Sequence, residues 1–232
     1  MTGIIIQARM GSTRLPGKVL MKVGSKNLLQ HIIDRLNLLQ VSDCKIVVAT
    51  SKEKSDDAVE SFCNENAIAC FRGDEKNVLN RFWMCTMQYG FDDIVRLTGD
   101  NPFVDITELE RLIEMHRSCN ADYSYSDTEL PEGLGAEIFS KQALQKSIEK
   151  AYKDNHFEHV DDYILENRNH FICQKLELDT CKVHPEMQFT VDTKEQLEKA
   201  CFIAEHAKDS FFGTLEAIRL EQLYQTTRNR KS

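Results

Sequence analysis

Residues 7–18, with the sequence QARMGSTRLPGK, combine positive charges, glycines and hydroxyl groups directly after an apolar run. The charges belong to Arg9, Arg14 and Lys18. Gly11 allows a ligand to approach the backbone closely, and Ser12 can donate a hydrogen bond alongside the backbone amides. A polyphosphate needs this mixture of amides and fixed cations, because several negative charges lie close together on it. The segment therefore predicts a phosphate-binding loop.

This loop does not follow the Walker A pattern, which has four residues between its glycines and a Ser or Thr after its Lys. Here five residues separate Gly11 from Gly17, and Val19 follows Lys18. The alternative to a phosphate loop is a surface turn that happens to be basic. Its position immediately after a buried strand favours the functional interpretation, because binding residues concentrate on loops of this kind.

Two aspartates that follow apolar segments are candidate metal ligands. Asp100 comes just after the predicted strand 93–97, and Asp192 ends the apolar segment 189–192, which we also predict to be a strand. Mg²⁺ on phosphates typically takes one or two carboxylates plus water, so both side chains could converge on one ion. The alternative for each aspartate is a cap on the helix that follows. The phosphate loop favours metal binding by the pair.

The elements that must position these residues alternate between strand and helix in the first half of the chain. Because this β-α-β-α order is typical of a parallel sheet with helices on both faces, we predict an α/β fold whose sheet is mostly parallel and becomes mixed in the second half. Predicted strands cover 3–6, 46–49, 68–71, 93–97, 121–125, 136–139, 173–178 and 189–192, and predicted helices lie near 28–39, 58–63, 78–83, 109–116, 141–151, 158–165, 194–207 and 215–223.

The chain has 232 residues, which suits one domain over 1–225, with a nucleotide-binding half at 1–120 and an acceptor-binding half at 121–225. We expect the polar tail 226–232 to fray. Lys plus Arg number 29 against 37 Asp plus Glu, so an acidic net charge of −8 disfavours a nucleic-acid partner. No apolar run is long enough to span a membrane, and we expect a cytoplasmic protein with reduced cysteines.

Several segments resemble a known family. The residues 4–18 resemble the start of the CMP-sugar-acid synthetases, such as 3-deoxy-manno-octulosonate cytidylyltransferase. The closer resemblance is to the SpsF-like cytidylyltransferases of spore coat polysaccharide biosynthesis, and it covers most of the chain. The matching segments are 7–18, 47–51, 72–74, 78–81, 96–102, 158–160 and 190–193.

The resemblance implies a Rossmann-like nucleotide-diphospho-sugar transferase fold and specific roles for residues. Arg9, Arg14 and Lys18 would hold the triphosphate of CTP, with Lys18 facing the pyrophosphate that leaves. Asp100 and Asp192 would bind Mg²⁺ or Mn²⁺. The residues that would surround the nucleotide are Ala8, Thr50, Ser51, Arg72, Gly73 and Arg81.

One departure from the family pattern bears on the acceptor. Many relatives carry an Asp where this chain has Gly135, in the segment 133–139. Glu137 is retained and could bind a hydroxyl or an amine of the acceptor; the alternative is an outward-facing strand residue. His159 could also contact the acceptor, or could be a buried or surface histidine without a role in binding.

These residues predict an in-line displacement at the α-phosphorus of a nucleoside triphosphate by a small sugar-like acceptor, with pyrophosphate as the second product. Alternatives are a sugar-1-phosphate nucleotidyltransferase that uses another base, and a protein that binds nucleotide without turning it over. A glycosyltransferase is disfavoured, because Asp100-Asn101-Pro102 lacks the second Asp of a D-x-D pair. By analogy with relatives, a homodimer is also expected.

Overall fold

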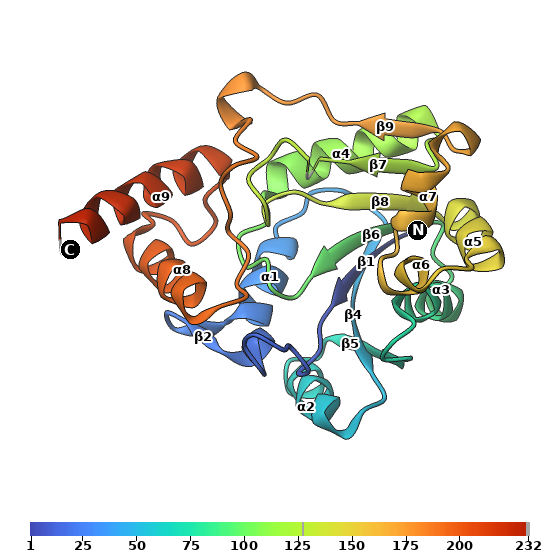
Figure 1. Cartoon of the computed structure of the whole chain (residues 1–232), viewed down its shortest axis with the longest axis horizontal. Helices are drawn as coiled ribbons and strands as arrows, with labels where there is room; N and C mark the ends of the chain where they lie inside the picture. Colours follow the sequence, from blue (N-terminus) through green and yellow to red (C-terminus); the bar gives the residue numbers. More distant parts are fainter. Residues whose placement is uncertain (127, 231–232) are drawn as a thin grey trace.

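The computed structural model describes residues 1–126 and 128–230. Seven strands of these residues form one sheet, in the order β5-β4-β1-β6-β8-β7-β9 (Figure 1). Their bounds are β1 Thr2–Gln7, β4 Cys44–Ser51, β5 Ala69–Gly73, β6 Asp93–Thr98, β7 Tyr123–Tyr125, β8 Glu137–Ser140 and β9 Cys173–Lys175. A small hairpin joins β2 (Lys22–Val23) to β3 (Lys26–Asn27).

The first four strands of the sheet run parallel, whereas β8 pairs antiparallel with both β6 and β7. The prediction of a mostly parallel sheet with a mixed second half is therefore confirmed. The register pairs Gln7 with Ala49 on one side and with Thr98 on the other. The loops that follow β1, β4 and β6 consequently meet at one edge of the sheet, where ligands bind in open α/β folds.

Side chains of β1 alternate between two cores, as the period of a strand requires. Ile4 and Ile6 pack with apolar residues of α1, α2 and α4, whereas Ile5 packs with those of α3, α5 and α7. A third cluster joins α8 and α9 to Leu15 of the predicted phosphate loop. The helices are α1 Leu28–Leu36, α2 Asp57–Glu65, α3 Val78–Tyr89, α4 Ile106–Cys119, α5 Lys141–Lys150, α6 Asp154–Glu158, α7 Asp162–Glu166, α8 Lys194–His206 and α9 Thr214–Asn229.

Short 3₁₀ helices supplement these elements at η1 Lys18–Leu20, η2 Lys54–Asp56, η3 Arg168–His170 and η4 Thr180–Lys182. Figure 1 shows α8 and α9 grouped beside the hairpin and α1, while α3, α5 and α6 group at the other side of the sheet. Within the described ranges, no helix has both the length and the apolar content needed to cross a bilayer.

Three predicted elements differ from the structure. Residues 189–192 are not a strand of the sheet; their backbone instead bonds to Glu132 and Asp100 in neighbouring loops. The predicted helix 158–165 is divided between α6 and α7, because the backbone at His159 is extended. Residues 226–229 do not fray but continue α9, where Arg228 pairs with Glu195 of α8. Residues 231–232 of the predicted tail lie outside the described residues.

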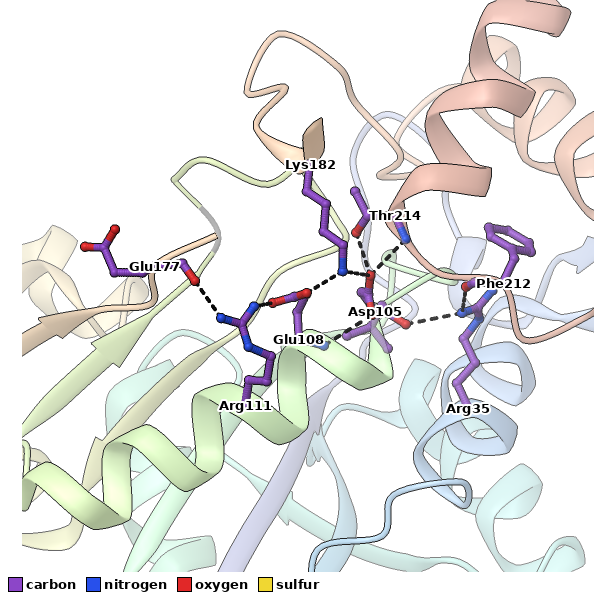
Figure 2. Close-up of polar contacts among 9 residues, drawn as sticks. Arg35, Asp105, Glu108, Arg111, Glu177, Lys182, Phe212 and Thr214 are labelled. Carbon is purple, nitrogen blue, oxygen red and sulfur yellow. Dashed lines mark hydrogen bonds and ion pairs between the residues drawn. The ribbon is translucent and has the colours of Figure 1, made fainter. Parts of the chain in front are cut away.

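A polar network around buried Asp105 fastens the start of α9 to α1 and α4 (Figure 2). Oδ2 of Asp105 accepts hydrogen bonds from the amide (2.8 Å) and the hydroxyl (2.6 Å) of Thr214, the first residue of α9. Arg35 of α1 donates to the carbonyl of Phe212 at 2.8 Å. Lys182 pairs with Glu108 and lies 4.0 Å from Asp105. This Asp105 network therefore joins α1, α4, η4 and α9.

Candidate active site

A cavity of about 800 Å³ lies at the carboxyl ends of β1 and β6. One wall is the predicted phosphate loop, another is the turn before α3, and α6 contributes a third. The cavity is lined by six of the residues predicted from sequence to touch nucleotide or metal, and by one predicted to touch acceptor: Arg9, Ser12, Arg14, Lys18, Asp100, Asp192 and His159.

The loop 10–17 closes on the carbonyl oxygen of Met10, which accepts hydrogen bonds from the amides of Ser12 (3.0 Å) and Gly17 (2.9 Å). Gly17 has a φ of 73°, in the left-handed region that favours glycine. The chain then enters η1, which begins at Lys18. This turn directs the Lys18 side chain into the cavity, while Gly11 lies exposed on the outer part of the loop.

Asp56 ties this loop to β4, a role that the sequence analysis did not identify. Its Oδ1 accepts from the amide of Met10 at 2.7 Å, and its Oδ2 accepts from the hydroxyl (2.5 Å) and the amide (3.0 Å) of Ser51. Burial alone would raise the pKa of Asp56, but the hydrogen bonds from Ser51 and Met10 outweigh it and lower that pKa. Ser51, predicted to meet the nucleotide, is thus buried and holds Asp56.

Lys18, Asp100 and Asp192 converge in the cavity although they lie far apart in the chain. Lys18 Nζ is 2.5 Å from Oδ2 of Asp100 and 2.7 Å from Oδ1 of Asp192. The lysine side chain is 9% exposed, so solvent screens these ion pairs only partly. Arg14 reaches the other oxygen of Asp192 at 2.9 Å, and Thr98 donates its hydroxyl to Asp100 at 2.5 Å.

Neither aspartate has the alternative role of a helix cap. The cap of α4 is Asp105, and the cap of α8 is Thr193, which forms a capping box with Gln196. Gln196 also accepts from the amide of Asp192 at 2.7 Å, and the amide of Val191 donates to the carbonyl of Asp100 at 2.9 Å. The backbone contacts therefore fix the two carboxylates relative to each other, and both side chains stay directed at the cavity.

The chemistry of this pair of donors suits a hard divalent cation. Two carboxylates already share one cationic partner, the Lys18 ammonium group. Within residues 1–126 and 128–230, no group of three or more His, Cys, Asp or Glu side chains is arranged to hold a metal. Mg²⁺ fits two protein carboxylates because it retains water and phosphate oxygens as its other ligands, whereas structural zinc requires four protein ligands.

Glu137 lies beneath the cavity and does not line it. It is buried on β8, directly opposite Arg96 of β6, and accepts hydrogen bonds from Arg96 Nη1 and from the hydroxyl of Tyr123. Arg96 does line the cavity. Burial of its guanidinium opposes the charge, but Glu137 outweighs this and raises the pKa of Arg96. The signal for Arg96 in the sequence is a lone cation within the apolar strand IVRLT.

His159 is exposed and lines the same end of the cavity, next to Phe157 and Glu158. The nearby His156 is fully buried, and its Nε2 lies 3.0 Å from Glu166. The two histidines therefore differ in environment, and only His159 faces the space that a ligand would fill.

Other residues predicted to surround the nucleotide do not line the cavity. Ala8 is buried and bonds through its amide to Ala49. Thr50 is fully buried. Arg72 points outward to Asp57 (2.7 Å) and Glu60 (2.8 Å).

Arg81 and Gly73 lie behind the turn that forms the cavity wall. Arg81 is fully buried and donates to the carbonyl of Asp74 at 2.6 Å. Burial, and then the charge of Arg9, lowers the pKa of Arg81 to about 10. Gly73 packs against it so closely that an added Cβ would lie 2.7 Å from Arg81 Cγ. The turn itself, residues 75–78, lines the cavity instead.

Comparisons with known proteins agree with this geometry. A family model described as cytidylyltransferase matches residues 3–224. The spore coat polysaccharide biosynthesis protein SpsF of Bacillus subtilis is 39% identical over 198 residues, which are 84% of this chain and 82% of that protein. An 8-amino-3,8-dideoxy-manno-octulosonate cytidylyltransferase of Shewanella amazonensis is 33% identical over 144 residues, covering 61% of this chain and 55% of that protein.

Among solved structures, a cytidylyltransferase from Leptospira borgpetersenii superposes with a TM-score of 0.88. It is 27% identical in sequence, and the match covers 98% of this chain and 95% of that one.

Proposed function

Because the chain belongs to the cytidylyltransferase family, and is therefore a nucleotidyltransferase, we propose that it transfers CMP from CTP to a sugar-like acid and releases pyrophosphate. The observation that carries this proposal is the convergence of Lys18, Asp100 and Asp192 in one cavity. A leaving pyrophosphate needs a cation beside it, and a phosphoryl centre needs a metal held by carboxylates. The site supplies residues for both needs within one space.

In this proposal the triphosphate lies along the loop 9–18. Arg9, Arg14 and Lys18 neutralise its charge, while the Ser12 hydroxyl is available as a donor. Lys18 acts on the bond that breaks, because negative charge grows on the pyrophosphate as it leaves. Asp56 keeps the loop in place through Met10.

Asp100 and Asp192 would hold Mg²⁺ in the loaded enzyme. When bound, the ion would neutralise charge on the α-phosphate and so favour attack by the acceptor oxygen. The two carboxylates sit on segments joined by the bond from Val191 to Asp100. That bond keeps both ligands in a fixed geometry, and positioning of this kind contributes strongly to phosphoryl-transfer rates.

The wall at 75–78 is proposed to contact the base and ribose, in place of the buried Thr50 and Ser51 and the outward-pointing Arg72. Asp74 shapes this wall by accepting from the amides of Lys76 and Asn77, each at 2.9 Å. Arg81 supports it from behind through the carbonyl of Asp74. Arg81 and Gly73 thus act on the nucleotide through the turn that they hold.

The test is pyrophosphate release by the purified protein with Mg²⁺, crossing CTP, UTP, GTP, ATP and dTTP with sugar acids and sugar phosphates. Release with CTP and a sugar acid, abolished by EDTA, is the expected result. Asp100→Asn should lower turnover about a hundredfold with an unchanged circular dichroism spectrum, because it removes charge from the proposed metal site. Release that occurs only with a nucleoside triphosphate other than CTP would contradict the assignment of CTP. The absence of release with every pair of substrates would contradict the proposal that the protein catalyses this transfer.

A further inference from the structure

Arg96 places a positive charge on the floor of the cavity, between the apolar residues Val95 and Leu97 of β6. Its side chain is 17% exposed. A charge buried at this depth is costly unless it is paired and hydrogen-bonded. The pairing with Glu137 is present, and the exposed part of the side chain lines the cavity, where a further ligand can reach it.

The contacts of Arg96 occupy only one part of its donor set. Nη1 donates to Glu137, whereas Nε is buried without a hydrogen-bond partner in the described part of the chain. Because Nε is buried, a ligand in the cavity can meet only the exposed part of the side chain, where a carboxylate would form a charge-assisted hydrogen bond. Glu137 is itself held by the Tyr123 hydroxyl. These contacts fix the orientation of the guanidinium.

Arg96 also has a suitable position relative to the proposed reaction centre. Alternation along β6 puts Arg96 and Thr98 on the same face of the sheet, about 7 Å apart between their Cα atoms. Thr98 donates to Asp100, one of the two proposed metal ligands. An acceptor whose oxygen reacts near Asp100 can therefore extend over Arg96 with its other polar groups.

The carboxylates around Arg96 and along the cavity act on its charge in different ways. Glu137 pairs with Arg96, and, against the effect of burial, the charges of Glu137 and Asp161 both raise the pKa of Arg96. Asp154 and Glu158 line the cavity on α6, but both residues are exposed, so water and salt screen them strongly. The partly exposed side chain of Arg96 can therefore meet an anionic group from the cavity side, and the rim favours hydroxyls or amines.

We propose that Arg96 binds the carboxylate of the acceptor and so selects sugar acids over neutral sugars. Glu137 and Tyr123 are positioning residues that orient the guanidinium. This role for Arg96 rests on the proposed function, because it assumes that the cavity accepts a sugar acid beside the nucleotide.

The first test compares Arg96→Met with the wild type in pyrophosphate release, using a sugar acid and its methyl ester as acceptors. The KM for the acid should rise at least about tenfold, as loss of a charged hydrogen-bonded pair requires, while the KM for CTP stays within about twofold. The preference for acid over ester should largely disappear. Arg96→Lys should retain part of that preference, and Tyr123→Phe should weaken it less than Arg96→Met.

The matched control is Arg117→Met, which removes an arginine that bonds to Thr2 at the opposite end of β1. Its kinetics should match those of the wild type. Equal losses with the acid and the ester in Arg96→Met would assign Arg96 a structural role and overturn the proposal, as would an unchanged KM for the acid.

A second measurement does not depend on turnover. Phenylglyoxal labelling of the wild-type protein, mapped by peptide mass spectrometry, should modify Arg96 more slowly in the presence of the same sugar acid than in the presence of its methyl ester. Equal labelling with both compounds would overturn the proposal. If no pair of substrates releases pyrophosphate, the proposed function fails, and the labelling still decides whether Arg96 recognises the carboxylate.

Discussion

The Nζ atom of Lys18 lies 2.5 Å from Oδ2 of Asp100, and the same nitrogen also contacts Asp192. A protonated amine therefore occupies the space between two carboxylates that we propose as metal ligands. In the loaded enzyme this amine must leave one or both carboxylates if it is to meet the pyrophosphate. A divalent cation held by these two carboxylates would thus compete with Lys18 for the same pair of oxygens.

Replacement of Lys18 by Met should strengthen metal binding in the absence of nucleotide. Without the ammonium group the two carboxylates repel each other, and a divalent cation relieves that repulsion. We expect the Kd for Mn²⁺, measured by electron paramagnetic resonance, to fall about tenfold, while turnover drops because the leaving group loses its cation. Lys26→Met is the matched control, since Lys26 pairs with Asp34 outside the cavity. Equal or weaker Mn²⁺ binding by Lys18→Met would refute the competition.

Replacement of Asp56 by Ala should loosen the phosphate loop. The substitution removes the acceptor for the Met10 amide and leaves the Ser51 hydroxyl without its partner. We expect a loss of about 1–3 kcal/mol in unfolding free energy and weaker binding of CTP, measured by thermal shift and fluorescence titration. Asp57→Ala provides the control, because Asp57 is exposed and pairs with Arg72. Nucleotide affinity that is the same in both variants would argue against the anchoring role.

Asp161 should make the fold less stable as the pH rises. Burial, and then the charge of Glu137, raises the pKa of Asp161 to about 6 from 3.8. An acid whose pKa is higher in the folded state stabilises the protein when protonated, so the contribution is complete below about pH 4 and is lost as the pH rises through about 6. Asp161→Asn should therefore have a higher Tm than the wild type at pH 8, with the difference closing towards pH 4. Glu149→Gln, on the exposed face of α5, controls for the loss of one negative charge; a Tm difference independent of pH would contradict the assignment.

Thr214→Val should weaken the attachment of α9. The hydroxyl of Thr214 donates to buried Asp105 at 2.6 Å, and valine keeps the shape while removing the donor. Because a buried carboxylate oxygen would keep the Thr214 amide but lose its hydroxyl donor, we expect a loss of about 1–3 kcal/mol in urea unfolding. Thr227→Val is the comparison, since the Thr227 hydroxyl bonds within α9 at an exposed position. A loss no larger than that of the comparison would show that the Asp105 network contributes little.

Residue type and position along the chain predicted the parts of the site that depend on chemistry alone. Arg9, Arg14 and Lys18 follow a buried strand, and the parallel register then brings their loop beside Asp100. Asp192 was predicted to join them from the end of a strand, yet it reaches the cavity from a loop. Its carboxylate chemistry was sufficient for the prediction, although the backbone context was wrong.

The direction in which a side chain points was less predictable. Arg72 of β5 pairs with Thr50 of β4 in the sheet. Its guanidinium, however, forms ion pairs with Asp57 and Glu60 on the outer surface of α2. Arg81 is drawn inward by the carbonyl of Asp74. The direction of each side chain depends on its partners. Some of these partners are distant in the chain and others offer only backbone atoms, so the residues next to Arg72 and Arg81 in the sequence do not indicate the direction.

The separation of 174 positions between Lys18 and Asp192 has a consequence for how the protein is made. During synthesis, the phosphate loop leaves the ribosome before residue 192 does. Its cations Arg14 and Lys18 therefore cannot pair with the Asp192 carboxylate until the intervening chain has followed. A nascent chain that has folded its first parallel strands can attract phosphates but cannot yet present both proposed metal ligands. On the proposed assignment, a chain that stops before residue 192 lacks one of the two metal ligands and should not turn over substrate.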